Sequence, residues 1–311
     1  MKTEFEFVVA DKLPEDALIS TPLTFAFVGR NLVLVEKKNG WWDIIGGKIE
    51  AGETWVEALK REAREEAGIL IDHIRVVGYV AAQNTGDTSG DIFPVENILP
   101  VTMSFAQEIY DDSLADDVVR RELFKRSEVG AILNKREDNG QLSEMFDHVV
   151  DSYDKRGFTY EFEYVEGETR ELDKMPKTQA MVFVKTNKGF LVVRDEGEGH
   201  YSLPGGGCYL NESGEECARR EVLEEAQCRM GPLKLLGTVI ARVQERGYTL
   251  SESRHLRYLA TATEMGDFIP LKDGLEIAER KEVGIDFLQK NTRVLNNATG
   301  MEIVEDLKMK I

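Results

Sequence analysis

Residues 47–69 read GKIEAGETWVEALKREAREEAGI, and this stretch decides the fold of the region around it. Thr54, followed three residues later by Glu57, forms the pattern of a capping box, which starts an α-helix. Gly68 can take the left-handed backbone conformation that ends a helix. The stretch therefore predicts a glycine-containing loop followed by a helix over residues 55–67.

Three glutamates of this predicted helix share one face. Glu62, Glu65 and Glu66 are spaced at i, i+3 and i+4, which brings their carboxylates together. Like charges on one face cost only roughly a few tenths of a kcal/mol per pair, so a solvated acidic face is the ordinary explanation of such a run. Hard divalent cations such as Mg²⁺, however, prefer several carboxylate oxygens. The face is therefore also a candidate metal site.

Two neighbouring features favour the metal site. Arg61 is placed to reach back to Glu53 at the helix start and brace its carboxylate. Gly46 and Gly47 allow the backbone of the preceding loop to approach a ligand closely. The segment thus combines an acidic face, a positioning arginine and an open loop.

The chain also repeats itself. Three short segments of the first half match three segments of the second half, in the same order and with nearly constant spacing. This repetition indicates a duplicated domain. We expect one domain at residues 1–155 and a second at residues 156–311. The paired segments are 47–69 with 206–228, 3–8 with 160–165, and 126–130 with 280–284.

Each repeat predicts the same order of elements. Two apolar runs split by turn residues indicate a hairpin, the loop and helix follow, and two further runs of strand formers lead to a closing helix. These elements predict an α+β fold, an α/β/α sandwich with a mixed sheet flanked by helices. The apolar and strand-forming runs are 24–36, 76–82 and 101–109 in the first repeat and 180–193, 235–243 and 256–261 in the second, and the closing helices are 142–153 and 301–309.

The second segment, residues 206–228, keeps the carboxylates of the first but differs around them. Ser213 and Glu216 again form a capping box. Asparagine tolerates the left-handed region fairly well and glutamine less so. We therefore expect the loop and the helix end to be reshaped while the carboxylate face persists. The differing positions are Asn211 for Gly52, Tyr209 for Glu50 and Gln227 for Gly68.

Composition and charge limit the functions of the chain. The 311 residues carry a formal net charge of −18, which disfavours general binding to nucleic acid or anionic membranes. Divalent cations at a carboxylate cluster would reverse the local field, so a small phosphorylated substrate fits this charge. Neither a signal peptide nor an apolar run of membrane-spanning length is found in the sequence, and we expect a cytoplasmic protein. Cys208, Cys217 and Cys228 lack zinc-site spacing and indicate reduced, packed thiols.

The pattern Gly47-x5-Glu53-x7-Arg61-Glu62-Ala63-x-Glu65-Glu66-x-Gly68-Ile69 resembles the Nudix box at every fixed position. The second segment resembles the same box with the edits given above. The resemblance implies two Nudix domains in tandem, the first with a complete box and the second with an edited one. It also implies hydrolysis of a nucleoside diphosphate linked to another group, with Mg²⁺ or Mn²⁺ bound by the box glutamates.

Carried over position by position, the resemblance implies roles for both boxes. Glu53 would brace the site or bind a further ion, with Arg61 orienting it, and Glu212 and Arg220 would do the same in the second box. The implied metal ligands are Gly47 through its carbonyl, Glu62, Glu65 and Glu66 in the first box and Gly206, Glu221, Glu224 and Glu225 in the second.

Further site residues are predicted outside the metal-binding set. Trp42 and Tyr201 lie where a ring would stack on a base or pack in the core. The glycines expected to contact substrate are Gly46, Gly47, Gly205 and Gly206, of which Gly47 and Gly206 are also implied metal ligands. The family often uses an additional acid beyond the box as base or ligand. The candidates here are Glu122 or Asp117 in the first domain and Glu276 or Asp273 in the second, and solvated loop acids are an equal explanation.

Alternative functions stay open at this point. A nucleotide-sensing protein with one or both domains non-catalytic is the main rival, and the second domain is the better candidate for sensing. An isomerase acting on isoprenyl diphosphates is disfavoured because we identify no matching Cys and Glu pair. Nucleoside triphosphates, dinucleoside polyphosphates and nucleotide sugars all remain as substrates, and the sequence does not specify an oligomeric state.

Overall fold

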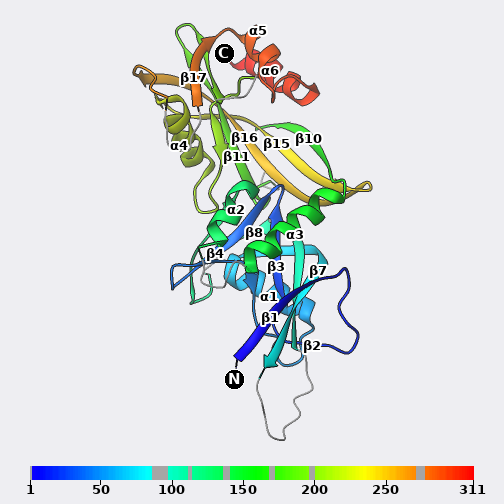
Figure 1. Ribbon diagram of the computed structural model, residues 1–311. Helices are drawn as coiled ribbons and strands as arrows, with labels where there is room; N and C mark the ends of the chain where they lie inside the picture. Colours follow the sequence, from blue (N-terminus) through cyan, green and yellow to red (C-terminus); the bar gives the residue numbers. More distant parts are fainter. Residues whose placement is uncertain are drawn as a thin grey trace, which may run out of the picture. The chain divides into compact units, whose positions relative to one another are not determined.

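A computed structural model describes residues 2–85, 97–110, 114–135, 141–167, 172–195, 200–270 and 277–311 (Figure 1). The chain divides into two compact units. The first comprises Met1–Thr159 with Val243–Glu252, and the second comprises Tyr160–Arg242 with Ser253–Ile311. The expected boundary at residue 155 coincides with the last residue of a helix, and it remains a prediction.

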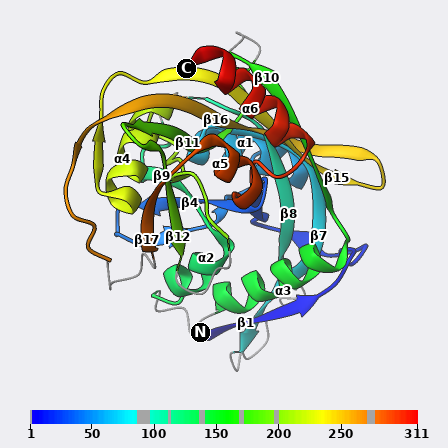
Figure 2. The same cartoon turned by 90° about the horizontal axis from the view of Figure 1, so that it is seen from above.

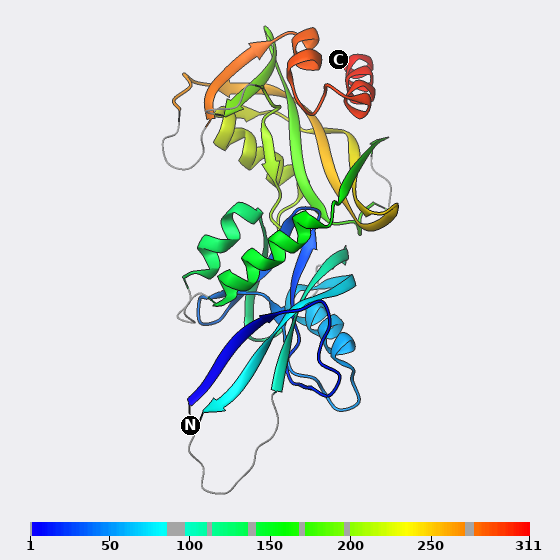
Figure 3. The same cartoon turned by 45° about the vertical axis from the view of Figure 1, so that its right-hand side comes forward.

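The first unit is built on a mixed sheet. Its strands run in the order β1-β7-β8-β3-β4-β5, with β2 beside β8, β6 beside β3 and β9 beside β4. The central pair β3 and β8 is parallel, and the other neighbours on this path are antiparallel. Helix α1 and helix α3 lie on opposite sides of this sheet (Figure 3). The elements are β1 Lys2–Val9, β2 Leu18–Ile19, β3 Leu23–Val28, β4 Asn31–Lys37, β5 Trp42–Asp43, β6 Ile45–Gly46, α1 Trp55–Ala67, β7 Ile69–Thr85, β8 Asn97–Ile109, β9 Val118–Phe124, α2 Arg126–Leu133 and α3 Gln141–Lys155.

The second unit repeats this plan. Its strands run in the order β10-β15-β16-β11-β12-β17, with β13 beside β11 and β14 beside β16. Strands β11 and β16 form the parallel pair that corresponds to β3 and β8. The elements are β10 Thr159–Glu166, β11 Lys177–Thr186, β12 Gly189–Asp195, β13 Gly205–Gly207, α4 Gly214–Ala226, β14 Cys228–Met230, β15 Lys234–Glu245, β16 Tyr248–Met265, β17 Ile277–Val283, α5 Ile285–Asn291 and α6 Ala298–Lys310.

Strand β11 shows why helices cover both faces of its sheet. Successive side chains of a strand point to opposite faces. Val182 and Val184 belong to a core with α4, whereas Met181 and Phe183 belong to a core with α5 and α6. The two helical layers accordingly lie on opposite sides of β11 and β12 (Figure 2). The predicted α+β sandwich is confirmed in both units.

One of the three sequence matches, that of residues 126–130 with 280–284, does not pair equivalent positions of the two folds. Strands β9 and β17 occupy the same place, because each runs antiparallel beside the second strand of its hairpin. Arg280 lies within β17, whereas Arg126 is the first residue of helix α2. The match of residues 126–130 with 280–284 therefore pairs a helix with a strand. By strand pairing, the structural partner of Arg280 is Arg121.

Helices in the described part of the chain are all too short or too polar to cross a membrane.

Candidate functional site

Helix α1 begins and ends where its sequence predicts. The Thr54 side chain accepts a hydrogen bond from the Glu57 backbone, and the Glu57 carboxylate accepts from the Thr54 backbone. Gly68 ends the helix in the left-handed conformation with φ of 56°. This local geometry fixes the direction in which the helix presents its acidic face to the preceding loop.

Arg61 binds three carboxylates at once. Its Nε and Nη2 donate to Glu53 at 2.8 and 3.2 Å, and its Nη1 donates to Glu62 at 2.8 Å and to Glu65 at 3.0 Å. Nη2 also donates to the Lys48 carbonyl at 2.9 Å, which ties the loop to the helix. The hydrogen bond from Arg61 lowers the pKa of Glu53 and keeps that carboxylate ionised. The predicted contact with Glu53 is present, and the arginine holds the metal-ligand candidates as well.

Two of the three face glutamates are turned away from solvent. The side chains of Glu62 and Glu66 are only 14% and 7% exposed, whereas that of Glu65 is 52% exposed. The Glu66 carboxylate accepts from the Gly46 backbone at 3.1 Å. A Cβ on Gly47 would lie 2.0 Å from the Glu62 carboxylate, so a larger residue there would displace this carboxylate. The acidic face therefore closes on the loop backbone and is not a solvated surface.

Lys37 is a functional candidate that the sequence did not reveal. Its ammonium donates to Glu66 and, at 2.9 Å, to Asp117. Burial raises the pKa of Glu66, and the neighbouring ammonium only partly offsets this effect. Burial lowers the pKa of Lys37, but its two carboxylate partners outweigh burial and raise it overall. Lys37 and Glu66 are 29 positions apart, so no local sequence pattern predicts their contact.

The second box reproduces the same arginine brace. Arg220 donates to Glu212 at 3.1 and 2.7 Å, to Glu221 at 2.7 Å and to Glu224 at 3.1 Å. It also donates to the Gly207 carbonyl at 2.8 Å, as Arg61 does to the corresponding loop of the first box. The carboxylate face of the second box is therefore as well ordered by its arginine as that of the first.

The glycine loop of the second box also matches. Glu225 accepts from the Gly205 backbone at 2.8 Å. A Cβ on Gly206 would lie 2.6 Å from the Glu221 carboxylate. Glu221 is buried, as Glu62 nearly is, whereas Glu225 is half-buried where Glu66 is buried. The persistence of the carboxylate face expected from the sequence is observed.

The expected change at the second helix end is wrong, and the change in the loop is present. Gln227 adopts the left-handed conformation with φ of 47°, and its side-chain amide exchanges two hydrogen bonds with the Ile269 backbone. These bonds stabilise a conformation that glutamine ordinarily disfavours. In the loop, Gly52 has a φ of 93°, whereas Asn211 is not among the described residues with positive φ. The loop backbone therefore differs at this position.

A second arginine in each domain holds the end of the box helix. Arg121 is 2% exposed and donates to the carbonyl of Ala67, the last residue of α1. Arg280 donates at 2.7 Å to the carbonyl of Ala226, the last residue of α4. Cations near a helix C-terminus satisfy its free carbonyls. Because both arginines come from a distant strand, sequence spacing gives no signal for this role.

The two candidate stacking residues both pack beside an ion pair. Trp42 contacts Phe124 edge-on at 4.8 Å, and the guanidinium of Arg120 lies 5.0 Å from its ring. Tyr201 contacts Phe287 edge-on at 5.4 Å and donates from its hydroxyl to Glu279 at 3.0 Å. Both rings are half-buried, so stacking on a base stays a prediction.

The candidate bases differ in their surroundings. Asp117 shares Lys37 with Glu66, which places it beside the box. Glu122 pairs with Arg120 at 2.6 Å, and it follows the buried Arg121 on β9, so it points to the other face of the strand. Both stay predictions. The second-domain candidates Asp273 and Glu276 lie outside the described residues.

The donor set suits a hard divalent cation. The first box offers oxygens from Glu62, Glu65 and Glu66 beside the backbone of Gly47, and Mg²⁺ prefers carboxylates, carbonyls and water. The second box offers the corresponding set. These residues fit Mg²⁺ or Mn²⁺.

Both units therefore carry one architecture, a mixed sheet whose loop and helix present arginine-braced carboxylates. The family model of the NUDIX domain matches residues 23–146 and again residues 175–298. The chain belongs to the Nudix family and contains two Nudix domains in tandem.

Relatives match the chain over short stretches. The oxidized purine nucleoside triphosphate hydrolase of Danio rerio is 35% identical over 63 residues, which cover 19% of this chain and 40% of that protein. The NAD-capped RNA hydrolase NudC of Vibrio cholerae is 29% identical over 102 residues, which cover 25% of this chain and 38% of that protein. The chain thus spans less than half the length of these relatives.

Solved structures match nearly half of this chain and most of their own length. The Bacillus subtilis pyrophosphohydrolase BsRppH matches with a TM-score of 0.38 and 19% identity, covering 48% of this chain and 90% of that one. A NUDIX hydrolase from Nitrosomonas europaea matches with a TM-score of 0.34 and 19% identity, covering 43% of this chain and 90% of that one.

Proposed function

We propose that the chain is a Mg²⁺-dependent hydrolase that cleaves the pyrophosphate linkage of a nucleoside diphosphate derivative. The observation that carries the proposal is the burial of Glu62 and Glu66 against the glycine loop. Arg61 and Lys37 pair with these two carboxylates and hold their oxygens beside the backbone of Gly47, where they offer a divalent cation several hard ligands. A merely solvated acidic face would leave these two side chains in water.

The chain's own residues order the site before any ligand arrives. Glu62, Glu65 and Glu66 would hold the cation, with the Gly47 carbonyl as a further ligand. Arg61 fixes Glu62 and Glu65, and the Gly46 backbone fixes Glu66, so these side chains need little reordering on binding. When bound, Mg²⁺ would neutralise charge on the diphosphate oxygens and lower the pKa of a coordinated water.

The names of the relatives and the net charge of the chain both bear on the substrate class. One relative is named for hydrolysis of oxidized purine nucleoside triphosphates and another for hydrolysis of NAD-capped RNA. The net charge of −18 disfavours long RNA and favours a small substrate accompanied by cations. We therefore place nucleoside triphosphates, dinucleoside polyphosphates and nucleotide sugars first.

A nucleotide-sensing role is the second candidate, and it concerns the second domain. The strand position that carries Lys37 in the first domain carries Asp195 in the second, as the pairing with β9 and β17 shows. In the sequence an acidic residue thus replaces a basic one, and Glu225 is half-buried where Glu66 is buried. The second domain would then bind a nucleotide with its cation and turn it over slowly.

The test is a screen of the full chain with Mg²⁺ against a panel of the three nucleotide classes. Released phosphate is read after phosphatase coupling, and the chain with Glu65→Gln and Glu66→Gln is the control for contaminating activity. Turnover that disappears in this control supports the proposal. If no nucleotide of the panel is hydrolysed while calorimetry shows that a nucleotide binds, the result favours sensing and contradicts hydrolysis.

A further inference from the structure

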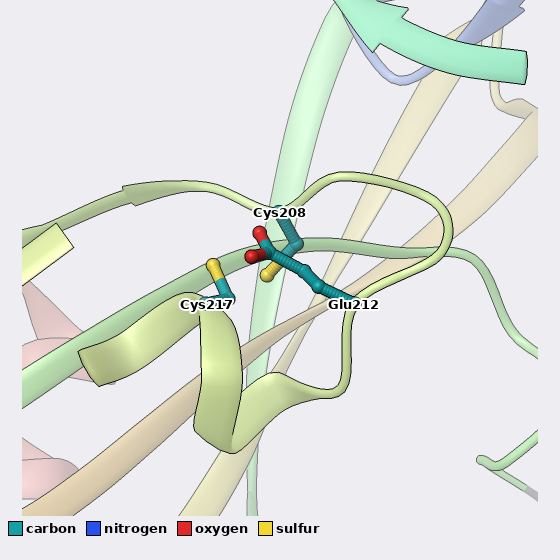
Figure 4. Close-up of side chains that lie close together, drawn as sticks. All are labelled: Cys208, Glu212 and Cys217. Carbon is teal, nitrogen blue, oxygen red and sulfur yellow. The ribbon is translucent and has the colours of Figure 1, made fainter. Parts of the chain in front are cut away.

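Two thiols and a carboxylate meet beside the second box (Figure 4). The Sγ atoms of Cys208 and Cys217 and a carboxylate oxygen of Glu212 all lie within 4.8 Å of one another. Cys208 directly follows β13, Glu212 lies in the loop, and Cys217 is in the first part of α4. The two cysteines are 2% and 0% exposed, so the sulfur atoms are shielded from solvent.

The thiols are not needed to build this loop and helix. The first box forms the same capping box, arginine brace and glycine contact with Ile49 and Ala58 at the two positions. Only the carboxylate is common to both, as Glu53 and Glu212. The second domain has therefore added two soft ligands to a shared hard one.

Glu212 keeps room for one more partner. Its Oε1 accepts from the Tyr209 backbone at 2.8 Å and from Arg220 at 2.7 Å, and its Oε2 accepts from Arg220 at 3.1 Å. An ionised carboxylate has about four acceptor positions, so one on Oε2 is unused by these bonds. A cation can bind there without displacing the arginine.

We propose that Cys208, Cys217 and Glu212 form a binding site for a thiophilic divalent cation such as Zn²⁺, separate from the carboxylate face of α4. Zinc binds sulfur at about 2.3 Å and carboxylate oxygen at about 2.0–2.2 Å in a tetrahedron, which places its ligand atoms roughly 4 Å or less apart. Small side-chain shifts would bring the three atoms to that spacing. A water would supply the fourth ligand.

Charge supports the assignment. Two thiolates, one carboxylate and a divalent cation sum to −1, and Arg220 lies beside them with its Nη2 3.9 Å from the Cys217 sulfur. Arg220 offsets part of this charge while it also binds Glu221 and Glu224, which limits the cost of removing the charges of the cluster from water. Thiolate ligands select Zn²⁺ over the Mg²⁺ that the glutamate face prefers.

The site would act on the second box through Arg220. A bound cation would shift the Glu212 carboxylate, which is hydrogen-bonded to Arg220. The same arginine also binds Glu221 and Glu224. Occupancy would therefore alter the carboxylate face of the second domain only. The first domain carries no thiol and would be unaffected.

The experiment uses the reduced full chain titrated with Co²⁺, a spectroscopic substitute for Zn²⁺. We expect about one ion per chain to give a thiolate-to-cobalt charge-transfer band, which Zn²⁺ displaces. A cation on the glutamate face gives no such band. Cys208→Ala and Cys217→Ala should each abolish the band and weaken Zn²⁺ binding at least about tenfold. Alanine at position 217 matches Ala58 of the first domain, and circular dichroism checks the fold.

Cys228→Ala is the matched control, because Cys228 is also buried in the second domain and lies outside the cluster. It should keep the full band. The proposal is overturned if the unaltered chain shows no thiolate band, or if the band survives in both cluster variants. It is also overturned if the two thiols form a disulfide in air, seen as a mass lower by two hydrogens, while no cation binds. None of these readouts depends on hydrolysis.

Discussion

Gly68 follows the last residue of helix α1 and Gln227 follows the last residue of helix α4, and both take the left-handed conformation. The glycine reaches it without a side chain to strain, and the glutamine reaches it with two hydrogen bonds to Ile269. Two different residues thus give the same helix end. A changed residue in the box therefore need not change the backbone when hydrogen bonds from a distant segment compensate.

The two domains differ more in the charged residues on the strands next to the box than in the box itself. Glu36 pairs with Arg120 in the first domain, and the same two strand positions carry Arg194 and Glu279 in the second, with the charges exchanged. Beside them, Lys37 of the first domain gives way to Asp195. The carboxylate faces are therefore alike, and their electrostatic surroundings are not.

Glu66→Gln should reduce turnover more than any other single change considered. This change keeps the side-chain shape but removes a buried negative charge that Gly46 and Lys37 hold in place. We expect turnover to fall about 10²–10³-fold, the range for loss of one preorganised charged or polar group. Steady-state kinetics measures the effect, and the corresponding Glu225→Gln should reduce turnover far less.

Asp151→Asn, a change on the exposed surface of α3, is the control for this pair. It should leave turnover unchanged. Equal losses from Glu66→Gln and Glu225→Gln would show that the two boxes contribute alike and would contradict the distinction between them.

The next largest effect is expected from Arg61→Lys. Lysine carries the charge but cannot hold three carboxylates with one planar group. We expect turnover and Mn²⁺ affinity of the first domain to fall about 10–100-fold, as for other residues that orient metal ligands. Mn²⁺ binding followed by electron paramagnetic resonance measures this. Arg220→Lys should weaken binding at the second box to the same extent, and unchanged Mn²⁺ affinity in both variants would refute the bracing role.

The smallest effects concern the helix ends. Gly68→Gln would place a Cβ 1.9 Å from the Arg121 guanidinium and adds left-handed strain of roughly 1–2 kcal/mol. With the arginine displaced, the free energy of unfolding of the first domain should fall by about 2–4 kcal/mol. Gln227→Gly relieves strain and loses two hydrogen bonds, and these effects oppose each other. The free energy of unfolding of the second domain should therefore change by no more than about 1 kcal/mol. Amide hydrogen exchange resolved by domain measures both, and a larger loss from Gln227→Gly would reverse the comparison.

Features set by neighbouring residues were predicted from the sequence. The start and end of α1, both capping boxes and the reach of Arg61 to Glu53 depend on residues at most a few turns apart. The tandem organisation followed from the repeated box. In each case the interaction is local, so spacing along the chain determines spacing in the structure.

Features that join distant segments were not predicted. Lys37 reaches Glu66 from a strand, and Arg121 and Arg280 reach the helix ends from β9 and β17. The order of strands in the sheet determines which residues contact the box helices, and short sequence repeats do not reveal that order. The same limit explains why Arg280 was matched to Arg126 and not to Arg121.

The central claim is that the first box carries most of the hydrolysis while the second binds its cation in altered surroundings. The most direct test compares three full chains on the substrate found in the screen: Glu65→Gln with Glu66→Gln, Glu225→Gln alone, and all three changes together. We predict that the first-box double variant loses most turnover and that Glu225→Gln alone keeps most of it. If the double variant keeps most of its turnover and loses it only when Glu225→Gln is added, hydrolysis belongs to the second box and the claim is wrong.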